Sequence, residues 1–202
     1  VTRIPAGDRL TPKTIAGMEA ELEQATTLLP DRRFAALAYC CTSGTARIGA
    51  ERVADRVLEA RSAQAVTNPL SAAMAAFSAL GVQSIGMVYP YLDSVAGPIQ
   101  AAFRQAGFEV PLSVGFGEPV ESRVARIDPA SVCDAALHLV REAAVDALFL
   151  SCTNLRTLDI IEDIEAKTGL PVLSSTQVLV WHLAQLTGFR VADTAPGRLF
   201  SS

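Results

Sequence analysis

The sequence predicts an α/β fold made of two similar lobes with parallel sheets, related by a pseudo-twofold axis. Three observations lead to this prediction. Short, continuous apolar runs of strand length alternate with amphipathic stretches of helical length, the pattern of parallel strands joined by helices. A motif in which Cys-Thr follows an apolar run occurs in each half of the chain. Half of the 202 residues are apolar, which is enough for a sizeable core.

The predicted strands are apolar runs without polar alternation, which is typical of strands buried on both faces of a parallel sheet. They lie at 34–39, 84–89, 145–150 and 171–174, with weaker candidates at 64–67 and 109–113.

The predicted helices lie between these runs, at 11–29, 50–61, 70–80, 94–106, 129–143, 157–168 and 177–187. Several are followed directly by a glycine, which closes a helix in the left-handed conformation at low cost. These glycines are Gly81, Gly107, Gly169 and Gly188. Gly115 and Gly117 follow no helix, and they predict a flexible connector that can act as a lid.

The repeated motif defines the predicted lobes. In Ala38–Ser43 and in Leu148–Asn154, an apolar run is followed by Cys-Thr and a small polar residue. A further strand ending in polar side chains follows each motif. We therefore expect a first lobe of residues 1–90 with a C-terminal portion at about 190–202, and a second lobe of residues 91–189.

Composition excludes several classes of function. The 17 Lys and Arg against 21 Asp and Glu give a net charge of −4, with no basic block for nucleic acid. No apolar run reaches the roughly 18 residues of a membrane span. The first residues do not resemble a signal peptide, so we expect a cytoplasmic protein. The four cysteines form no Cys-x-x-Cys pair, and we expect reduced thiols.

The repeated motif also predicts chemistry. Ligands of open parallel sheets bind beyond the carboxyl ends of the strands, where both Cys-Thr pairs are expected. Unpaired backbone N–H groups there bind carboxylates and lower the pKa of a thiol. Side-chain donors come from Thr42, Ser43, Thr153 and Asn154. Two facing thiols can transfer protons on opposite faces of one carbon, or one can add to the substrate and the other protonate it. Neither route needs a metal or a cofactor.

The alternative for each cysteine is a buried, packed side chain, which is common for this residue type. The shared context of Cys41 and Cys152 favours a catalytic role for these two. Cys40 precedes the strand end and Cys133 lies within a predicted helix, so both are predicted to be structural.

Segments around both cysteines resemble a known family. Cys41–Gly44 and Leu150–Leu158 are similar to the two active-site segments of the Asp/Glu racemase superfamily, in the branch that contains maleate cis–trans isomerase and arylmalonate decarboxylase. The runs 3–8 and 174–182 are similar to the ectoine-utilisation proteins of that branch. The resemblance covers essentially the whole chain.

The resemblance implies two flavodoxin-like lobes with the active site between them and no cofactor. It places Cys41 in the first catalytic position and Cys152 in the second. Two thiols point to a racemase or isomerase acting on a small dicarboxylate or an amino acid. The alternatives are an arylmalonate-type decarboxylase that uses Cys152 alone and a carboxylate-binding domain without turnover.

The resemblance also implies substrate-binding residues. Thr42, Ser43 and Thr153 match positions that bind the substrate carboxylate, and Tyr91 matches the family's carboxylate-binding tyrosine, whereas Tyr89 is expected in the core. Members of the family begin with a strand and a loop that precede the first residue here, so we expect the N-terminal strand of the first lobe to be missing. A homodimer is one expected assembly.

The remaining candidates lie on predicted helices. Gln177, at the start of the last helix, is expected to donate to the substrate. His138 has no partner with metal-ligand spacing, so we predict no metal site. For His182 a position in the cleft competes with a packed or surface position. For Arg156 a position in the cleft competes with a surface ion pair to Asp159 or Glu162.

Overall fold

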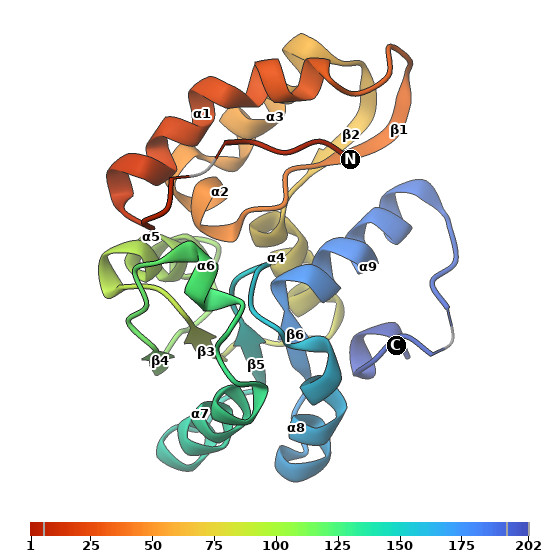
Figure 1. Ribbon diagram of the computed structural model, residues 1–202. Coiled ribbons are helices and arrows are strands. Elements are labelled where there is room, and N and C mark those ends of the chain that lie inside the picture. The colour runs from red at the N-terminus through yellow and green to blue at the C-terminus, as the bar shows by residue number, and fades with distance from the viewer. Residues whose placement is uncertain (6, 193, 202) are drawn as a thin grey trace.

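The computed structural model describes residues 1–5, 7–192 and 194–201, and it contains two parallel sheets (Figure 1). The first pairs β1 (Phe34–Ala38) with β2 (Ala63–Thr67). The second has the order β4-β3-β5-β6, with β3 (Ile85–Tyr89), β4 (Ser113–Gly115), β5 (Ala147–Leu150) and β6 (Val172–Ser174). All strand pairs are parallel. The predicted α/β class with parallel strands is confirmed.

Three helices lie in the same part of the structure as the first sheet. They are α1 (Pro12–Thr27), α2 (Thr42–Ile48) and α3 (Ala50–Ala60). The helix α1 begins at Pro12, where the missing N–H costs nothing, and Thr11 and Thr14 close its first turn with a capping box. It packs against both α2 and α3.

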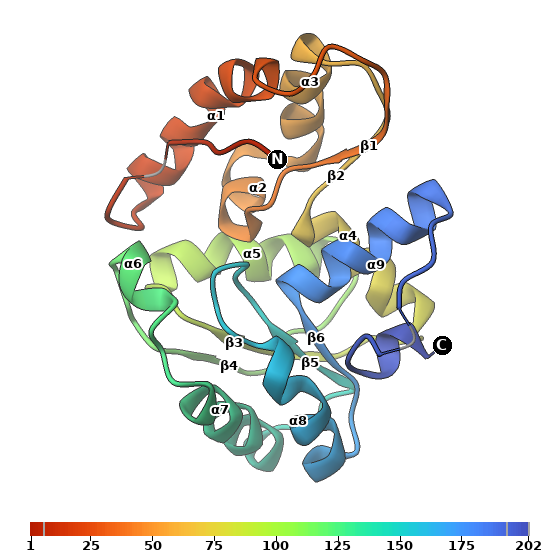
Figure 2. The ribbon, with the colours of Figure 1, turned by 45° about the vertical axis from the view of Figure 1, so that its right-hand side comes forward.

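The second sheet holds the main core. Every residue of β3, β5 and β6 is buried. Phe149 of β5 packs edge to face on Phe77 and Phe103, with ring centroids 5.7 and 5.4 Å apart, the geometry that aromatic pairs prefer. Figure 2 shows α7 (Pro129–Glu142) and α8 (Ile161–Thr168) on one side of this sheet and α5 (Asp93–Gln105) on the other.

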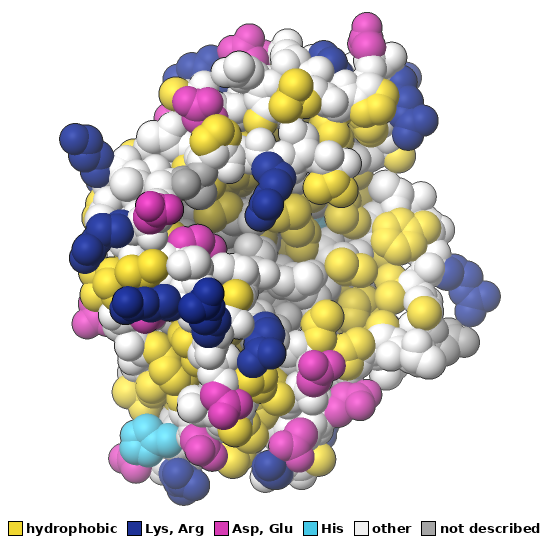
Figure 3. All heavy atoms as spheres, viewed as in Figure 1, with side chains coloured by type: hydrophobic (Ala, Val, Ile, Leu, Met, Phe, Trp, Pro, Cys, Tyr) yellow, Lys and Arg dark blue, Asp and Glu magenta, His cyan; other side chains and the backbone are white. Residues whose placement is uncertain are grey.

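Two helices connect the sheets. The helices α4 (Pro69–Ala79) and α9 (Ser175–Thr187) pack against each other, and α9 contacts β1, β2 and β6. In both ribbon views they lie between the first sheet with its helices and the second sheet (Figures 1 and 2). The space-filling view shows the surface hollowed in this region, with hydrophobic side chains exposed in the hollow (Figure 3). Among the described residues, none of the helices has both the length and the apolar character needed to cross a bilayer.

Local patterns predicted most elements well, and all four predicted helix-closing glycines have positive φ. The exceptions are short. The helices α2 and α6 (Glu121–Val124) were not predicted, and the strand expected at 109–113 is β4, at Ser113–Gly115. A 3₁₀ turn, η1 (Leu158–Ile160), opens the helix expected at 157–168.

The sheets divide the chain differently from the expected lobes. The strand β3 was expected in the first lobe, which was to extend to residue 90, but it pairs with β4 and β5. The C-terminal portion was also expected there, whereas η2 (Arg198–Phe200) packs against β6 and α9. Ala6 of the Arg3–Asp8 run, and Asp193 and Ser202 of the C-terminal portion, lie outside the described residues.

Candidate active site

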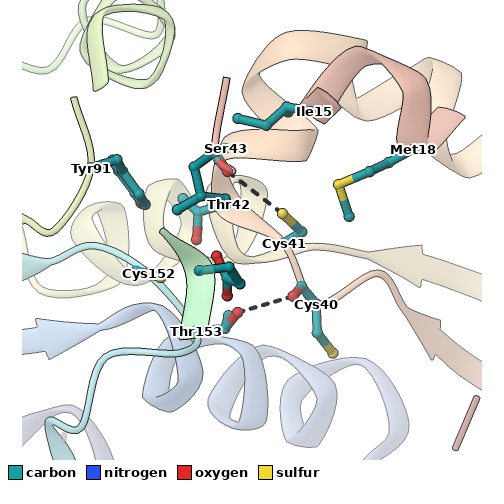
Figure 4. A pocket seen from close by; sticks show the side chains of 11 residues that line it. Ile15, Met18, Cys40, Cys41, Thr42, Ser43, Tyr91, Cys152 and Thr153 are labelled. Atoms are coloured by element: carbon teal, nitrogen blue, oxygen red, sulfur yellow. Dashed lines mark hydrogen bonds between the residues drawn. The ribbon is translucent and has the colours of Figure 1, made fainter. Parts of the chain in front are cut away.

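One cavity contains both motif cysteines. It has a volume of about 140 Å³ and lies where the ends of β1 and β5 meet the first turns of α1 (Figure 4). Its walls are formed by Leu10, Ile15, Met18, Cys40, Cys41, Thr42, Ser43, Tyr91, Glu121, Cys152 and Thr153. Six residues predicted for the site therefore share one cavity: Cys41, Thr42, Ser43, Tyr91, Cys152 and Thr153.

Cys41 caps the N-terminus of α2. Its backbone is extended, and its Sγ accepts the Gly44 N–H at 3.3 Å and lies 3.6 Å from Ser43 Oγ. Burial raises the pKa of the Cys41 thiol, and hydrogen bonds from Ser43, the Gly44 N–H and Tyr39 oppose that rise because they favour the thiolate. A Cβ at position 44 would collide with the Tyr39 hydroxyl and lie 3.0 Å from Cys41 Sγ. Glycine at this position therefore permits the close approach.

Cys152 follows β5 in a strained backbone conformation. Its φ of +124° is the only positive φ of a non-glycine residue in the described chain. Such a conformation costs of order 1–3 kcal/mol and persists where the surrounding contacts impose it, often at functional sites. The Cys152 N–H donates to Ser175 Oγ at 3.0 Å, and Sγ accepts the Asn154 N–H at 3.4 Å. Burial raises the pKa of Cys152 to about 12, so the group is a thiol at neutral pH.

Hydroxyl groups join the two motifs. Buried Thr42 donates to Ser175 Oγ at 2.8 Å, and that oxygen also accepts the Cys152 N–H. Thr153 donates to the Cys40 carbonyl at 3.0 Å. The two strand ends are thus held together by side chains that come from opposite halves of the sequence.

Tyr91 is buried in the cavity wall, and its hydroxyl lies 2.8 Å from Ser151 Oγ. Burial raises its pKa well above the ordinary value, so the phenol keeps its proton. Its ring stacks on Tyr89, which donates to Asp93 at 2.7 Å and is buried, as expected of a core residue.

Two predicted substrate-binding residues do not line the cavity. Gln177 is buried, but its oxygen accepts the Ser174 N–H at 3.3 Å and its amide donates to the Pro196 carbonyl at 2.7 Å. Both ends of its side chain therefore cap α9 and hold the C-terminal segment instead of facing the site. Asn154 donates to Glu121, to Oε1 at 2.8 Å and to the carbonyl at 3.1 Å.

The histidines and the arginine candidate also lie outside the cavity walls. His182 Nδ1 is 2.8 Å from Thr67 Oγ1 and its ring stacks on Trp181, which is the packed position of the two alternatives. Arg156 is exposed, and no ion pair to Asp159 or Glu162 occurs within the described chain. Among described residues no cluster of His, Cys, Asp and Glu could hold a metal ion.

The other cysteines differ in position. Cys133 is buried on α7, with Sγ 3.8 Å from Asp163 and 3.9 Å from Lys167, which agrees with a structural role. Cys40 is exposed and borders the cavity, but its sulfur points away from Cys41, toward the Ala38 carbonyl at 3.9 Å (Figure 4).

Several wall residues were not predicted. Leu10, Ile15 and Met18 belong to the segment around α1, whose pattern indicates a buried face without indicating that it borders a ligand. Glu121 begins the one-turn helix α6, and no motif surrounds it. Burial raises the pKa of Glu121, and the hydrogen bond from Asn154 opposes that rise.

Comparisons with known proteins find relatives along most of the chain. A family model described as arylmalonate decarboxylase matches residues 9–200. The arylmalonate decarboxylase of Bordetella bronchiseptica is 32% identical over 137 residues, which are 66% of this chain and 57% of that enzyme. A maleate isomerase of Pseudomonas putida is 28% identical over 191 residues, 91% of this chain and 75% of that enzyme.

Solved structures share the fold along nearly the whole chain. The maleate isomerase Iso from Pseudomonas putida S16 superposes with a TM-score of 0.85 at 21% identity, covering 97% of this chain and 82% of that one. A variant of arylmalonate decarboxylase in its liganded form has a TM-score of 0.84 at 25% identity, covering 98% and 85%.

Proposed function

Because the chain belongs to the arylmalonate decarboxylase family, which includes isomerases and decarboxylases, we propose that it isomerises or racemises a small carboxylic acid through Cys41 and Cys152 without a cofactor. The observation that carries the proposal is that both thiols line a single cavity of about 140 Å³. A small acid in this cavity contacts two thiols. Each thiol can remove a proton from a carbon atom, donate a proton to it or add to it as a nucleophile.

The two thiols have different environments, which assigns their roles. Cys41 Sγ has hydrogen-bond donors that favour its thiolate, and Cys152, with a pKa of about 12, keeps its proton at neutral pH. In an isomerisation, the Cys41 thiolate forms a C–S bond as the C=C π bond breaks. The Cys152 thiol then donates its proton to the carbanion that this leaves on the adjacent carbon. Rotation about the new single bond follows. Transfer of either hydrogen of that carbon back to Cys152 as a proton then re-forms the C=C bond as the C–S bond breaks and the Cys41 thiolate leaves.

In a racemisation the same thiols act on a saturated carbon. The Cys41 thiolate removes the proton next to the carboxylate, and the Cys152 thiol delivers its own proton to the opposite face. Both reactions pass through a carbanion next to a carboxylate, which hydrogen-bond donors stabilise as its oxygens gain charge.

Donors for that carboxylate are available at the cavity wall. The first N–H groups of a helix have no partner within the helix. At the start of α2 the Gly44 N–H donates to Cys41 Sγ. The N–H groups of Thr42 and Ser43 remain available to a ligand. We assign carboxylate binding to these groups, to the Thr153 N–H and to Tyr91, because the hydroxyls of Ser43 and Thr153 already bond to Cys41 Sγ and to the Cys40 carbonyl. Thr42 contributes its N–H, because its hydroxyl is used by Ser175.

The test is proton exchange. Candidate acids are incubated with the enzyme in heavy water, and deuterium incorporation next to the carboxylate is followed by NMR. We expect Cys41→Ala and Cys152→Ala to abolish incorporation and Cys133→Ala, which removes a thiol outside the cavity, to retain it. An unchanged rate in either of the first two variants contradicts the proposal.

A decarboxylation of a malonate-type acid through Cys152 alone is the second candidate. It is favoured by the family description and by the 32% identity to an arylmalonate decarboxylase. Release of carbon dioxide that survives in Cys41→Gly, together with loss in Cys152→Ala, supports this candidate over the isomerase or racemase.

A further inference from the structure

Among the described residues, the wall of the cavity has one carboxyl group and no basic side chain. Of its wall residues within the described chain, Glu121 is the single acid, and none is Lys or Arg. Neither does any Lys, Arg or His of the described residues form an ion pair with Glu121. The local charge is therefore unfavourable for a ligand with two carboxylates.

Glu121 is held in place by neutral groups from both sides. Its Oε1 accepts from Asn154 Nδ2 at 2.8 Å, and its backbone N–H donates to the Asp8 carbonyl at 3.1 Å. The other carboxylate oxygen receives no hydrogen bond from the described residues and is free to accept one from a ligand. These contacts fix the side chain against the cavity without neutralising its charge.

Glu121 lies at the border between the cavity and a wider outer hollow. That hollow has a volume of about 500 Å³ and is lined by Arg3, Gly7, Asp8, Glu121, Ser122, Ala125, Thr153 and Asn154. Glu121 and Thr153 belong to both walls. A ligand whose reacting carbon lies between the thiols can therefore extend its other end toward the Glu121 carboxylate.

We propose that Glu121 binds an ammonium group of the substrate, so that the cavity selects a small amino acid over a dicarboxylic acid. This inference rests on the proposed function, since it uses the same cavity and the same reacting thiols. The substrate class follows from charge: an ammonium group pairs with the buried carboxylate, whereas a second carboxylate in its place is repelled.

The ion pair also has a consequence for the thiols. The charge of Glu121 raises the pKa of both Cys41 and Cys152, because a nearby negative charge disfavours a thiolate. An ammonium group bound at Glu121 cancels that charge and makes the Cys41 thiolate easier to form. Binding of the matching substrate therefore activates the nucleophile.

Binding measurements test the selectivity without turnover. Calorimetric titrations compare propionate with alanine and β-alanine, and succinate with L- and D-aspartate. We expect an ammonium-bearing acid to bind about tenfold to a hundredfold more tightly than its matched partner, the usual gain from a charge-assisted hydrogen bond. Glu121→Gln keeps the acceptor for Asn154 but removes the charge, and it is expected to abolish the preference.

Glu118→Gln is the matched control. It makes the same charge change nearby, outside the cavity, and its amide oxygen can still accept the Val120 N–H that Glu118 accepts at 2.9 Å. We expect it to leave the preference intact. The inference is overturned if no pair shows an ammonium preference, if succinate binds best, or if Glu121→Gln and Glu118→Gln behave alike.

The two proposals fail in different ways. An ammonium preference that depends on Glu121, combined with no deuterium exchange, contradicts the proposed reaction and leaves the selectivity in place. Deuterium exchange that needs both cysteines, with an unchanged rate in Glu121→Gln, contradicts the selectivity alone.

Discussion

The hydroxyl of Thr42 donates a hydrogen bond to the hydroxyl of Ser175 at 2.8 Å, and both side chains are buried. The same Ser175 oxygen accepts the N–H of Cys152 at 3.0 Å. One hydroxyl at the start of α9 thereby connects the residue that follows Cys41 with the backbone of Cys152. This connection links the two segments that carry the candidate catalytic thiols.

Removal of that hydroxyl is expected to affect stability and activity together. In Ser175→Ala, the Thr42 hydroxyl and the Cys152 N–H lose a buried partner, which costs about 1–3 kcal/mol of unfolding free energy. Urea denaturation measures this loss, and kcat is expected to fall because Cys152 is less well held. Thr187→Ala, at the exposed end of α9, should change neither quantity appreciably. A Ser175→Ala protein with unchanged kcat would show that the connection is not needed for the reaction.

The strained backbone of Cys152 predicts an unusual order of stabilities. Glycine tolerates positive φ and alanine does not, so Cys152→Gly is expected to be as stable as Cys152→Ala or more so, by about 1 kcal/mol. In the helix α7 the order should reverse, with Cys133→Gly about 1 kcal/mol less stable than Cys133→Ala. Urea denaturation of the four variants decides the matter. The same order at both positions would mean that Cys152 is not strained.

The rate is expected to increase with pH from neutral to alkaline conditions. Burial raises the pKa of Cys41, so the reactive thiolate fraction grows as the pH rises toward that value. Cys152 stays protonated until the pH approaches about 12, so its role as acid is not lost in the same interval. Profiles of kcat/KM against pH test this. Ser43→Ala removes a donor to Cys41 Sγ and should shift the ascending limb to higher pH. A descending limb near neutrality would contradict the assigned roles.

Gly44 is expected to be intolerant of a side chain for a reason that a second substitution can remove. A Cβ at this position collides with the Tyr39 hydroxyl and lies 3.0 Å from Cys41 Sγ, so Gly44→Ala should lose about 1–3 kcal/mol of stability and much of the activity. Tyr39→Phe removes the obstructing hydroxyl, and the double variant should be more stable than additivity predicts. Gly17→Ala, with open space around its Cβ, is the control and should be stabilising. Additive losses would contradict the steric explanation.

Much of the fold was predictable because its signals are local. Helices such as α7 have an apolar face and terminal signals within a short stretch, so their bounds were predicted within a residue or two. The helix α2 was missed because its seven residues include Thr42, Ser43, Gly44 and Thr45, a composition typical of a loop. The homodimer, the cytoplasmic location and the resemblance to ectoine-utilisation proteins stay predictions.

The candidate site was predictable in part. The repeated Cys-Thr motif identified residues that share a cavity, since the carboxyl ends of parallel strands meet ligands at the same edge. Glu121 was not predictable, because α6 is positioned by long-range contacts: an antiparallel bridge pairs Arg9 with Val120, and the Glu121 N–H donates to Asp8. Gln177 was predicted to face the substrate, but its partner Pro196 is distant in sequence.

The sequence by itself determined the alternating α/β architecture and the two motifs that carry the thiols. The spacing of apolar residues and the Cys-Thr motif are properties of short segments, so they can be recognised in the sequence without the tertiary structure. The tertiary structure alone decided which side chains meet. Ser175 lies between Thr42 and Cys152, and Glu121 lies in a cavity wall that has no Lys or Arg among its described residues. These relationships depend on how separate elements pack, and packing sets both the burial that shifts the thiol pKa values and the charge that a ligand encounters.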